Sequence, residues 1–301
     1  MRCAYLGPEG TFSEQAMRMY APDAEAVACL DVPTALDAVR SREVDIAVVP
    51  MENSVEGGVN ATIDALSHGS SLWIVGEVVV PIQFQLVGRG ALADVKRIGT
   101  HPHGWAQCRR WVHENLPEAI HVPTSSTAGA AAEIADGTAE FDAALCSRIS
   151  QEKYNLPVLA ADVADNRHAV TRFVAVSLPG KLPPPTGADK TTLMVHLAHN
   201  EAGGLMEMLE QFAVRGINLS RIESRPIGDS LGRYDFSIDV EGHVEEERIQ
   251  AVLIGLHRMS PLVRFIGSYP SADGRPVRLR PGTSDADFVA ARAWVASLLG
   301  R

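Results

Sequence analysis

A glycine- and threonine-containing loop near the start of the chain has the residue types that bind anions. Residues 7–16 read Gly-Pro-Glu-Gly-Thr-Phe-Ser-Glu-Gln-Ala and follow a short strand expected over 2–6. Thr11 and Glu14 have the Thr-x-x-Glu spacing of a capping box, which predicts that a helix begins there. The first N–H groups of such a helix, at the positive end of its dipole, attract anions. One such loop is weak evidence for an anion-binding site. The interpretation gains weight because the same pattern is repeated along the chain.

The same order of strand, polar loop and helix returns three times, over 44–66, 97–115 and 119–135. Strands that alternate with helices indicate parallel α/β sheets. In such sheets, ligands bind where loops leave the carboxyl ends of the strands. These loops carry Thr, Ser, Asn and Gly rather than bulky apolar residues. The pattern therefore predicts a polar cleft for a small, oxygen-rich anion.

Composition narrows the class of protein. A chain of 301 residues with 46% hydrophobic and 21% charged residues is typical of a soluble protein of two or three domains. The formal net charge of −10 argues against nonspecific nucleic-acid binding. The start of the chain has no basic-then-apolar leader, and no apolar run approaches ~18 residues. We therefore expect a cytoplasmic protein that does not cross a membrane.

Cysteine and histidine spacing gives no sign of a metal site. Cys3, Cys29, Cys108 and Cys146 are far apart, which predicts reduced thiols in core positions. The histidines lack ligand spacings such as His-Glu-x-x-His. We expect a structural or substrate-polarising role for His101 rather than metal ligation.

The chain is expected to fold as α/β domains separated by a Pro-rich linker at 179–189. Residues 1–178 form the first domain, which a late strand closes by returning to its sheet. Residues 190–270 read βαββαβ, a ferredoxin-like arrangement with a turn at Gly228-Asp229-Ser230. Open sheet edges in that domain favour pairing with a second copy. The tail, 271–301, ends in a helix whose apolar face is expected to pack on the body or on another subunit.

Several motifs, in order from Cys3 to about Tyr269, resemble those of the prephenate dehydratase family in its form without a fused mutase. Any one of them is weak, but together with the linker and the βαββαβ unit they are specific. The motifs are Gly7-Pro8-Glu9-Gly10-Thr11-Phe12-Ser13, Pro50-Met51-Glu52-Asn53-Ser54 with Gly57-Gly58, Ser126-Thr127-Ala128, Thr171-Arg172-Phe173, and Asn218-Leu219 with Glu223-Ser224-Arg225-Pro226.

The resemblance implies a fold and a regulatory mode. The first domain would be two α/β lobes around a cleft, like a type-two periplasmic binding protein. The second would be an ACT domain, which binds an amino-acid effector at its dimer interface. Phenylalanine would be that effector, and the chain would form a homodimer or homotetramer. The expected effector-binding residues are Gly203, Gly204, Leu205, Asn218, Leu219, Glu223, Ser224 and Arg225.

The resemblance also implies a lyase reaction in phenylalanine biosynthesis, without cofactor or metal. Prephenate would lose water and carbon dioxide together and give phenylpyruvate. Thr171 would donate to the departing hydroxyl, Arg172 would bind a carboxylate through its planar fork, and Phe173 would pack near the ring. The expected substrate-binding residues are Thr11, Asn53, Ser54, Ser126 and Thr127.

Plainer interpretations stay open for several of these residues. Thr11, Ser126 and Thr127 could be helix caps, and Arg172 could be the exposed start of a strand. Glu52 could be a solvated acid or part of the proton-transfer machinery. An ion pair between Glu223 and Arg225 is the plain alternative to effector binding.

The sequence departs from the family pattern at four places. The asparagine usual before Thr-Arg-Phe is Ala169, the Ser-His-Pro loop begins with Thr100, and the usual glutamine is His103. The Pro-Gly-Ala-Leu effector loop is Ala202-Gly203-Gly204-Leu205. Two other functions stay open: an arogenate dehydratase, which acts on the transaminated substrate, and a cytosolic sensor whose cleft only binds an anion.

Overall fold

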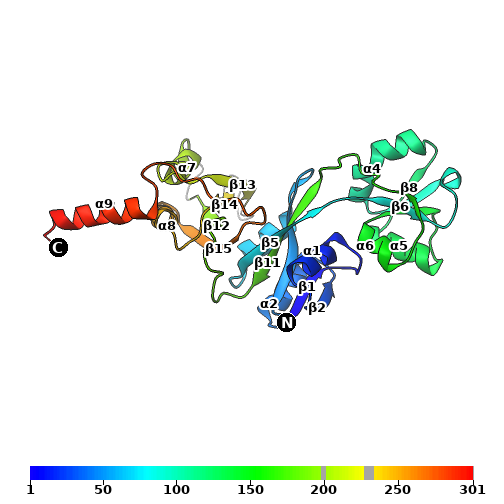
Figure 1. Cartoon of the computed structure of the whole chain (residues 1–301), viewed down its shortest axis with the longest axis horizontal. Coiled ribbons are helices and arrows are strands. Elements are labelled where there is room, and N and C mark those ends of the chain that lie inside the picture. The colour runs from blue at the N-terminus through cyan, green and yellow to red at the C-terminus, as the bar shows by residue number, and fades with distance from the viewer. Residues whose placement is uncertain (198–200, 227–233, 301) are drawn as a thin grey trace. The chain divides into compact units, whose positions relative to one another are not determined.

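The chain folds into two compact units (Figure 1), and the computed structural model describes residues 1–197, 201–226 and 234–300. Residues 63–77 pack with the second unit although they interrupt the first in sequence. The turn expected at 228–230 lies outside the described residues. The units are Met1–Thr62 with Val78–Ala175, and Ile63–Glu77 with Val176–Arg301.

The first lobe of the first unit is a sheet with the strand order β11-β3-β1-β2. β1 pairs in parallel with both β2 and β3. Helix α2 buries Val32, Ala35, Leu36 and Val39, a helical stripe that packs against this sheet. The expected return of the late strand to this sheet is confirmed by β11. The elements are β1 (Arg2–Leu6), α1 (Phe12–Tyr20), β2 (Glu25–Cys29), α2 (Val32–Arg40), β3 (Ile46–Asn53), β4 (Gly57–Gly58) and β11 (Val170–Ser177). Two further elements, α3 (Asn60–Ser67) and β5 (Trp73–Pro81), have residues in both units.

The second lobe of the first unit is a five-stranded sheet with the order β10-β6-β9-β7-β8. β7 lies parallel to both β8 and β9, as the alternation of strands and helices predicts. The alanine-rich helix α5 packs on β9 because its small side chains allow close approach. The elements are β6 (Gln85–Gly88), η1 (Leu92–Asp94), β7 (Arg97–Thr100), α4 (Pro102–Asn115), β8 (Ile120–Pro123), α5 (Thr127–Asp136), β9 (Ala143–Cys146), α6 (Arg148–Lys153) and β10 (Val158–Ala160).

The second unit confirms the expected βαββαβ order, with the strands arranged β13-β14-β12-β15. Met208 and Phe212 of α7 and Ile249, Val252 and Leu256 of α8 are fully buried in its core. The predicted fold class is therefore confirmed as a two-lobed α/β unit plus a ferredoxin-like domain. The elements are β12 (Asp189–His196), α7 (Gly204–Ala213), β13 (Leu219–Pro226), β14 (Tyr234–Glu241), α8 (Glu247–Met259), β15 (Leu262–Pro270) and α9 (Asp285–Leu298).

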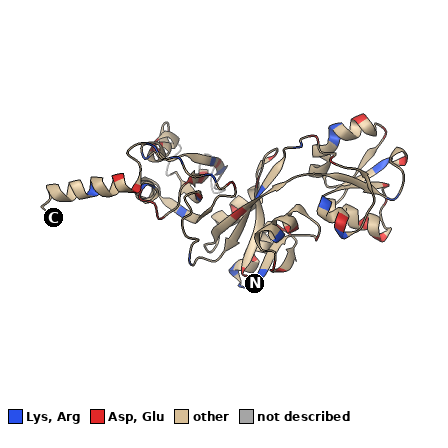
Figure 2. Ribbon diagram, in the orientation of Figure 1, with Lys and Arg blue, Asp and Glu red and all other residues tan. Residues whose placement is uncertain are grey.

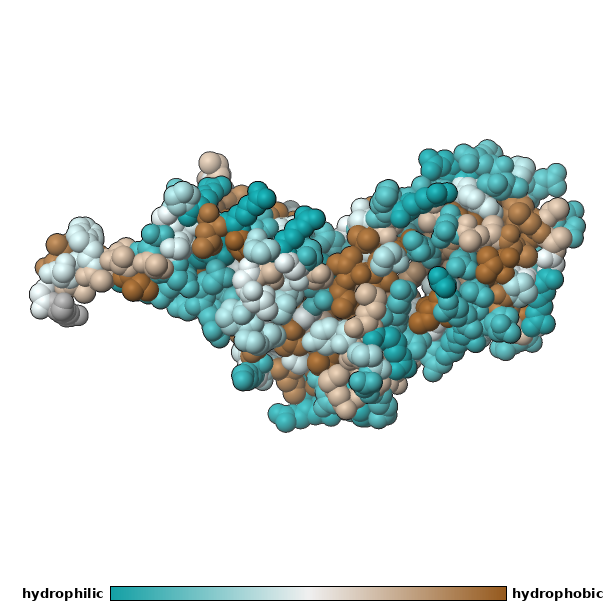
Figure 3. All heavy atoms as spheres, viewed as in Figure 1, coloured by the Kyte–Doolittle hydropathy of each residue, from teal (hydrophilic) through white to brown (hydrophobic). Residues whose placement is uncertain are grey.

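The final helix, α9, has an unusually exposed surface. It forms the C-terminal end of the second unit (Figure 1) and contacts α8, yet none of its side chains is buried. Trp294 and Leu298 are about two-thirds exposed, and most of the helix carries no charge (Figure 2). A space-filling view shows uncharged and apolar residues along its visible face (Figure 3). Within the described residues, no helix is long and apolar enough to cross a membrane.

Candidate active site

A cavity of about 350 Å³, with both apolar and polar walls, opens in the first unit between its two lobes. The starts of three helices line it. Thr11 caps α1 in the first lobe, and His101 and Ser126 cap α4 and α5 in the second. The first N–H groups of a helix have no partner within the helix and lie at the positive end of its dipole. The cavity is therefore suited to a ligand with more than one negative charge.

Thr11 and Ser126 are helix caps. The capping box expected at α1 is not formed, because Glu14 binds the N–H of Gly10 rather than that of Thr11. Thr11 Oγ1 accepts a hydrogen bond from the Glu14 N–H at 3.3 Å, and the Glu14 carboxylate accepts from the Gly10 N–H at 2.7 Å. Ser126 Oγ accepts from the Gly129 N–H at 2.8 Å. Thr127 is the first residue of α5 and also lines the cavity. Capping and ligand binding are compatible here, because the caps fix helix starts that face the cavity.

Thr171 lies at the start of β11 and is held by Asn53. Asn53 Nδ2 donates to Thr171 Oγ1 at 2.8 Å, while Asn53 Oδ1 accepts from the N–H groups of Val55 and Glu56 at 2.8 and 3.1 Å. Those two backbone donors fix the orientation of the amide, so its NH₂ group faces Thr171. Because the threonine oxygen accepts from Asn53, its own O–H remains available to donate to a ligand.

Other predicted site residues surround Thr171 without lining the cavity. Arg172 comes next on β11, so its side chain points to the opposite face of the strand. Its Nη1 lies 3.7 Å from Glu52 Oε2, and its side chain is 10% exposed. Phe173 is buried in the core. Ser54 joins its loop to β11, since its N–H donates to Val170 O and its Oγ accepts from the Val170 N–H.

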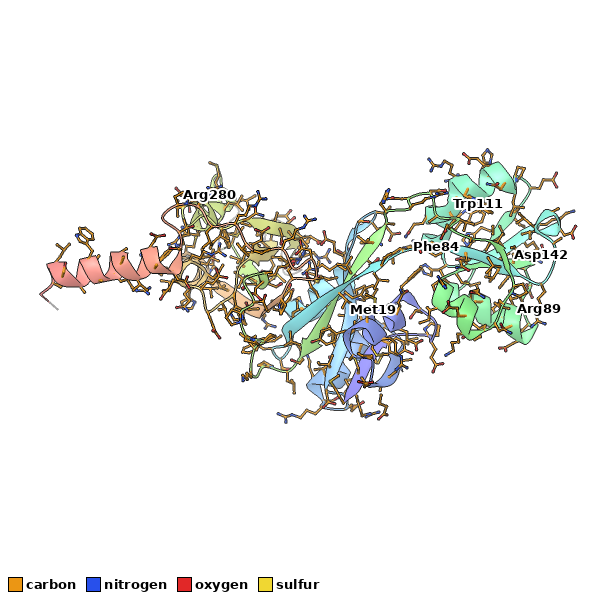
Figure 4. The ribbon with its side chains drawn as sticks, viewed as in Figure 1. Met19, Phe84, Arg89, Trp111, Asp142 and Arg280 are labelled. Carbon is orange, nitrogen blue, oxygen red and sulfur yellow. The ribbon has the colours of Figure 1, made fainter. Side chains whose placement is uncertain are left out.

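The apolar wall of the cavity comes from residues that the sequence analysis did not single out for binding. The rings of Phe12 and Phe84 meet edge to face at 5.5 Å between centroids. Phe84 belongs to the segment that leads into the second lobe (Figure 4). Val59 and Ile82 line the same cavity. The sequence signal was present for Phe12, which directly follows Thr11, but an apolar residue after a cap is also expected in a core.

A second group of missed residues lies where the two lobes meet at the cavity. His103 Nδ1 lies 2.9 Å from Glu56 Oε2, and Gln107 Nε2 donates to Glu56 Oε1 at 3.3 Å. Gln107 Oε1 is buried without a hydrogen-bond partner in the described part of the chain. His101 Nδ1 accepts from the His103 N–H at 3.2 Å. Burial, and then the neighbouring His103, lower the pKa of His101, so its ring is neutral near pH 7.

The lobes also meet at a buried junction beside α1. Ser147 Oγ and Ser150 Oγ, both from the second lobe, donate to Gly10 O at 2.8 and 2.6 Å. Gly10 has a φ of +87°, and a Cβ there would lie 2.9 Å from Ser150 Oγ. A glycine is therefore required for both the backbone conformation and the close approach.

The predicted effector residues fall into two groups in the second unit. Gly203 precedes α7 with a φ of +96°, whereas Asn218 follows the end of that helix. A helix of ten residues is about 15 Å long, so one chain does not bring these two residues together. Asn218 Nδ2 instead donates to Glu241 Oε1 at 2.8 Å. Leu205 is largely exposed, and Leu219 packs against the core.

The far end of β13 carries two ion pairs. Arg225 Nε and Nη2 donate to both carboxylate oxygens of Asp64 on α3, at 3.0 and 2.7 Å. Glu223 accepts from Arg221 at 3.2 Å. The alternative ion pair between Glu223 and Arg225 is therefore not the arrangement observed, because each side chain pairs with another residue. Ser224, between them, is exposed.

The cysteines and histidines form no reactive or metal-binding cluster in the described residues. All four cysteines are free and buried, as expected. Burial raises the pKa of Cys146 to about 12 and that of Cys3 to about 11, so both thiols are protonated near pH 7. No three His, Cys, Asp or Glu side chains among the described residues are placed to hold a metal ion.

These features define a two-lobed α/β protein with a cleft lined by helix starts and an attached ferredoxin-like domain. The sequence model of the family described as prephenate dehydratase matches residues 3–181. That match covers more than half of the chain, so the chain belongs to the prephenate dehydratase family.

Individual relatives are similar to this chain over at least 91% of its length. The prephenate dehydratase of Amycolatopsis methanolica is 46% identical over 299 residues, covering 99% of this chain and 97% of the relative. A crystal structure of prephenate dehydratase from Arthrobacter aurescens in complex with L-Phe is 52% identical, with a TM-score of 0.95 and full coverage of both chains. The structure described as GqqA, a novel type of quorum quenching acylase, is 32% identical with a TM-score of 0.82, covering 91% of this chain and all of that one.

Proposed function

We propose that this chain is a prephenate dehydratase that converts prephenate to phenylpyruvate in phenylalanine biosynthesis. One observation carries the proposal: the free O–H of Thr171 faces a cavity that three helix starts line. Prephenate has two carboxylates and one ring hydroxyl that must leave. The cavity offers positive helix ends for the carboxylates and an oriented donor for the hydroxyl. Membership of the family supports the same reaction.

The proposed step balances without an added reactant other than a proton. The bond between the ring and its carboxylate breaks and releases carbon dioxide. The electron pair moves into the ring, which becomes aromatic as the bond to the hydroxyl breaks. The hydroxyl takes up a proton and leaves as water. Thr171 acts as an oriented donor to that oxygen, because an ordinary threonine is a poor acid in its own right.

The protein's contribution is orientation and charge stabilisation. The starts of α1 and α5 bind the carboxylates through backbone N–H groups that are already aligned. Phe12 and Phe84 form the apolar wall against which the ring packs. Arg172 lies next to this cavity without lining it. Its proposed role is to hold the Glu52 carboxylate, beside which its side chain lies. Phe173 supports the strand from the core.

The second unit is proposed to be an ACT domain through which phenylalanine inhibits the enzyme. The two groups of effector residues, near Gly203 and near Asn218, are too far apart for one ligand in one chain. A second copy could supply the missing group, which supports a homodimer or homotetramer. The exposed apolar residues Trp294 and Leu298 of α9 also favour contact with a second copy. We place this enzyme in the cytoplasm.

Turnover of prephenate tests the proposed reaction. Purified protein should form phenylpyruvate from prephenate, and phenylalanine should reduce the rate. Faster turnover of arogenate would make the chain an arogenate dehydratase. Binding of either substrate without product would favour a sensor.

The acylase activity ascribed to the GqqA structure is not favoured, because no hydrogen bond joins a serine hydroxyl to a histidine ring among the residues that line the cavity.

A mixing experiment tests the two-copy effector site. Asn218→Ala and Gly203→Asp each remove one of the two groups, and each homogeneous variant should lose inhibition by phenylalanine. Mixed oligomers would contain one intact site in each pair of variant chains, so inhibition should return in part. Inhibition that persists in homogeneous Asn218→Ala, or fails to return on mixing, would place the effector elsewhere.

A further inference from the structure

Glu56 contacts both lobes of the first unit at the cavity. It lies in the loop between β3 and β4 of the first lobe, and its carboxylate is bound by two side chains of α4 in the second lobe. His103 Nδ1 lies 2.9 Å from one oxygen, and Gln107 Nε2 donates to the other at 3.3 Å. His103 and Gln107 are four residues apart, so they lie on one face of the helix. All three residues line the cavity.

The backbone of Glu56 is joined to the proposed proton donor. Its N–H donates to Asn53 Oδ1 at 3.1 Å, and the NH₂ group of the same asparagine donates to Thr171 Oγ1 at 2.8 Å. The position of Glu56 therefore affects the orientation of Asn53, which in turn orients Thr171. A contact across the cleft is thus linked to the donor through one intermediate residue.

We propose that Glu56 is a positioning residue, which closes the cleft onto His103 and Gln107 and thereby orients Thr171 through Asn53. The inference rests on the proposed function, because Thr171 serves as the donor in that reaction. Gln107 contributes a second role: its buried, unpartnered Oε1 provides an acceptor for a hydroxyl group of the bound substrate. Closure should therefore raise the affinity for substrate as well as the rate.

Glu56 is the acidic partner of His103 at this contact. The other histidines nearby are His101, on the same helix start, and His121, which stacks on Trp105 of α4.

The expected effect is modest because the contact is exposed. The side chains of His103 and Glu56 are 69% and 36% exposed, and water weakens ion pairs of this kind. We expect kcat/KM for prephenate to fall by about two- to fivefold when this contact is removed in Glu56→Gln. Most of the change should appear in KM, because the contact closes the cleft on bound substrate.

The test uses His103→Gln and Glu56→Gln in the full-length chain, with kcat and KM for prephenate measured at one fixed pH. Each variant should raise KM more than it lowers kcat, and the double variant should raise KM no more than the weaker-binding single variant. His113→Gln is the matched control, since His113 is an exposed histidine on the same helix that does not line the cavity. It should keep the wild-type KM.

Two results would overturn the proposal: a wild-type KM in His103→Gln, or increases in KM that add in the double variant. Hydrogen exchange gives a second readout that needs no turnover. At one fixed pH near 6, the Val55 and Glu56 amides should exchange faster in Glu56→Gln and His103→Gln than in the wild type. Equal exchange would reject the positioning role of the contact between Glu56 and His103. This result does not depend on whether prephenate is the substrate, so it separates a failure of this inference from a failure of the proposed function.

Discussion

The sheet of the second unit and the cleft of the first use polar side chains in opposite ways. In the sheet, Asp239 is fully buried and accepts from Arg221 Nε at 3.0 Å and from Thr192 Oγ1 at 2.8 Å. Thr192 also shares a hydrogen bond of 2.7 Å with the Tyr269 hydroxyl. These groups satisfy one another, so the network builds structure.

In the cleft, polar groups are only partly satisfied. The Thr171 hydroxyl accepts a hydrogen bond from Asn53, and its own O–H is free to donate. Gln107 Nε2 donates to Glu56, while Gln107 Oε1 has no partner in the described chain. Buried polar groups without partners are costly, so their presence in a native cavity calls for a ligand or water. The difference shows which polar clusters serve stability and which serve chemistry.

The largest effect is expected where the closed network is broken. Asp239→Ala leaves Arg221 buried without its main partner, and should lower the free energy of unfolding by about 3–5 kcal/mol. Glu223→Ala removes the more exposed acid on the same arginine, 25% exposed, and should cost less than about 1 kcal/mol. Urea unfolding of the full chain measures both. Equal losses would mean that the network is not the stabilising unit described here.

Gly10→Ala tests the junction between the lobes of the first unit. The residue has a φ of +87° and would place its Cβ 2.9 Å from Ser150 Oγ. Backbone strain alone should cost about 1–2 kcal/mol, and the clash should add to it. Gly57→Ala is the matched control, because Gly57 has a φ of +84° with nothing within 4 Å of a Cβ. Thermal unfolding should show a larger loss for Gly10→Ala, and similar losses would remove the role given to the close approach.

Asp64→Asn tests whether a polar pair can serve regulation rather than stability or chemistry. Arg225 binds both oxygens of Asp64, and α3, which carries Asp64, follows the loop of Asn53 and Glu56. Weakening the pair should raise the phenylalanine concentration for half-inhibition by about fivefold, a typical coupling between sites, with turnover unchanged when phenylalanine is absent. Glu210→Gln, an exposed change on α7, should leave inhibition intact. Wild-type inhibition in Asp64→Asn would exclude the pair from the coupling.

Local features of the fold were predictable from the sequence, whereas long-range pairings were not. The start of α1 was predicted because Thr11 and Glu14 lie within one turn, and that of α5 because Ser126 is a residue type that caps helices. The βαββαβ order followed from hydrophobic periodicity. By contrast, Arg225 and Asp64 lie 161 residues apart, and no local pattern connects them.

The same limit applies to the site. Thr171 and Asn53 were predicted on motifs, and the structure joins them by a hydrogen bond. The orientation of Arg172 could not be read from the motif, because it depends on which face of β11 meets the cavity and on Glu52 of the neighbouring strand. His103 was named only as a departure from the family pattern and Glu56 was not singled out, since their pairing depends on how the two lobes meet.

Prephenate turnover by Thr171→Ala and Thr171→Ser tests the central claim most directly. Loss of one oriented donor should lower kcat by about 100-fold or more in Thr171→Ala. Thr171→Ser keeps the hydroxyl that Asn53 orients, so it should retain most of the activity, and both variants should unfold at nearly the wild-type temperature. Undiminished turnover in Thr171→Ala would contradict the assignment of Thr171 as the donor to the departing hydroxyl.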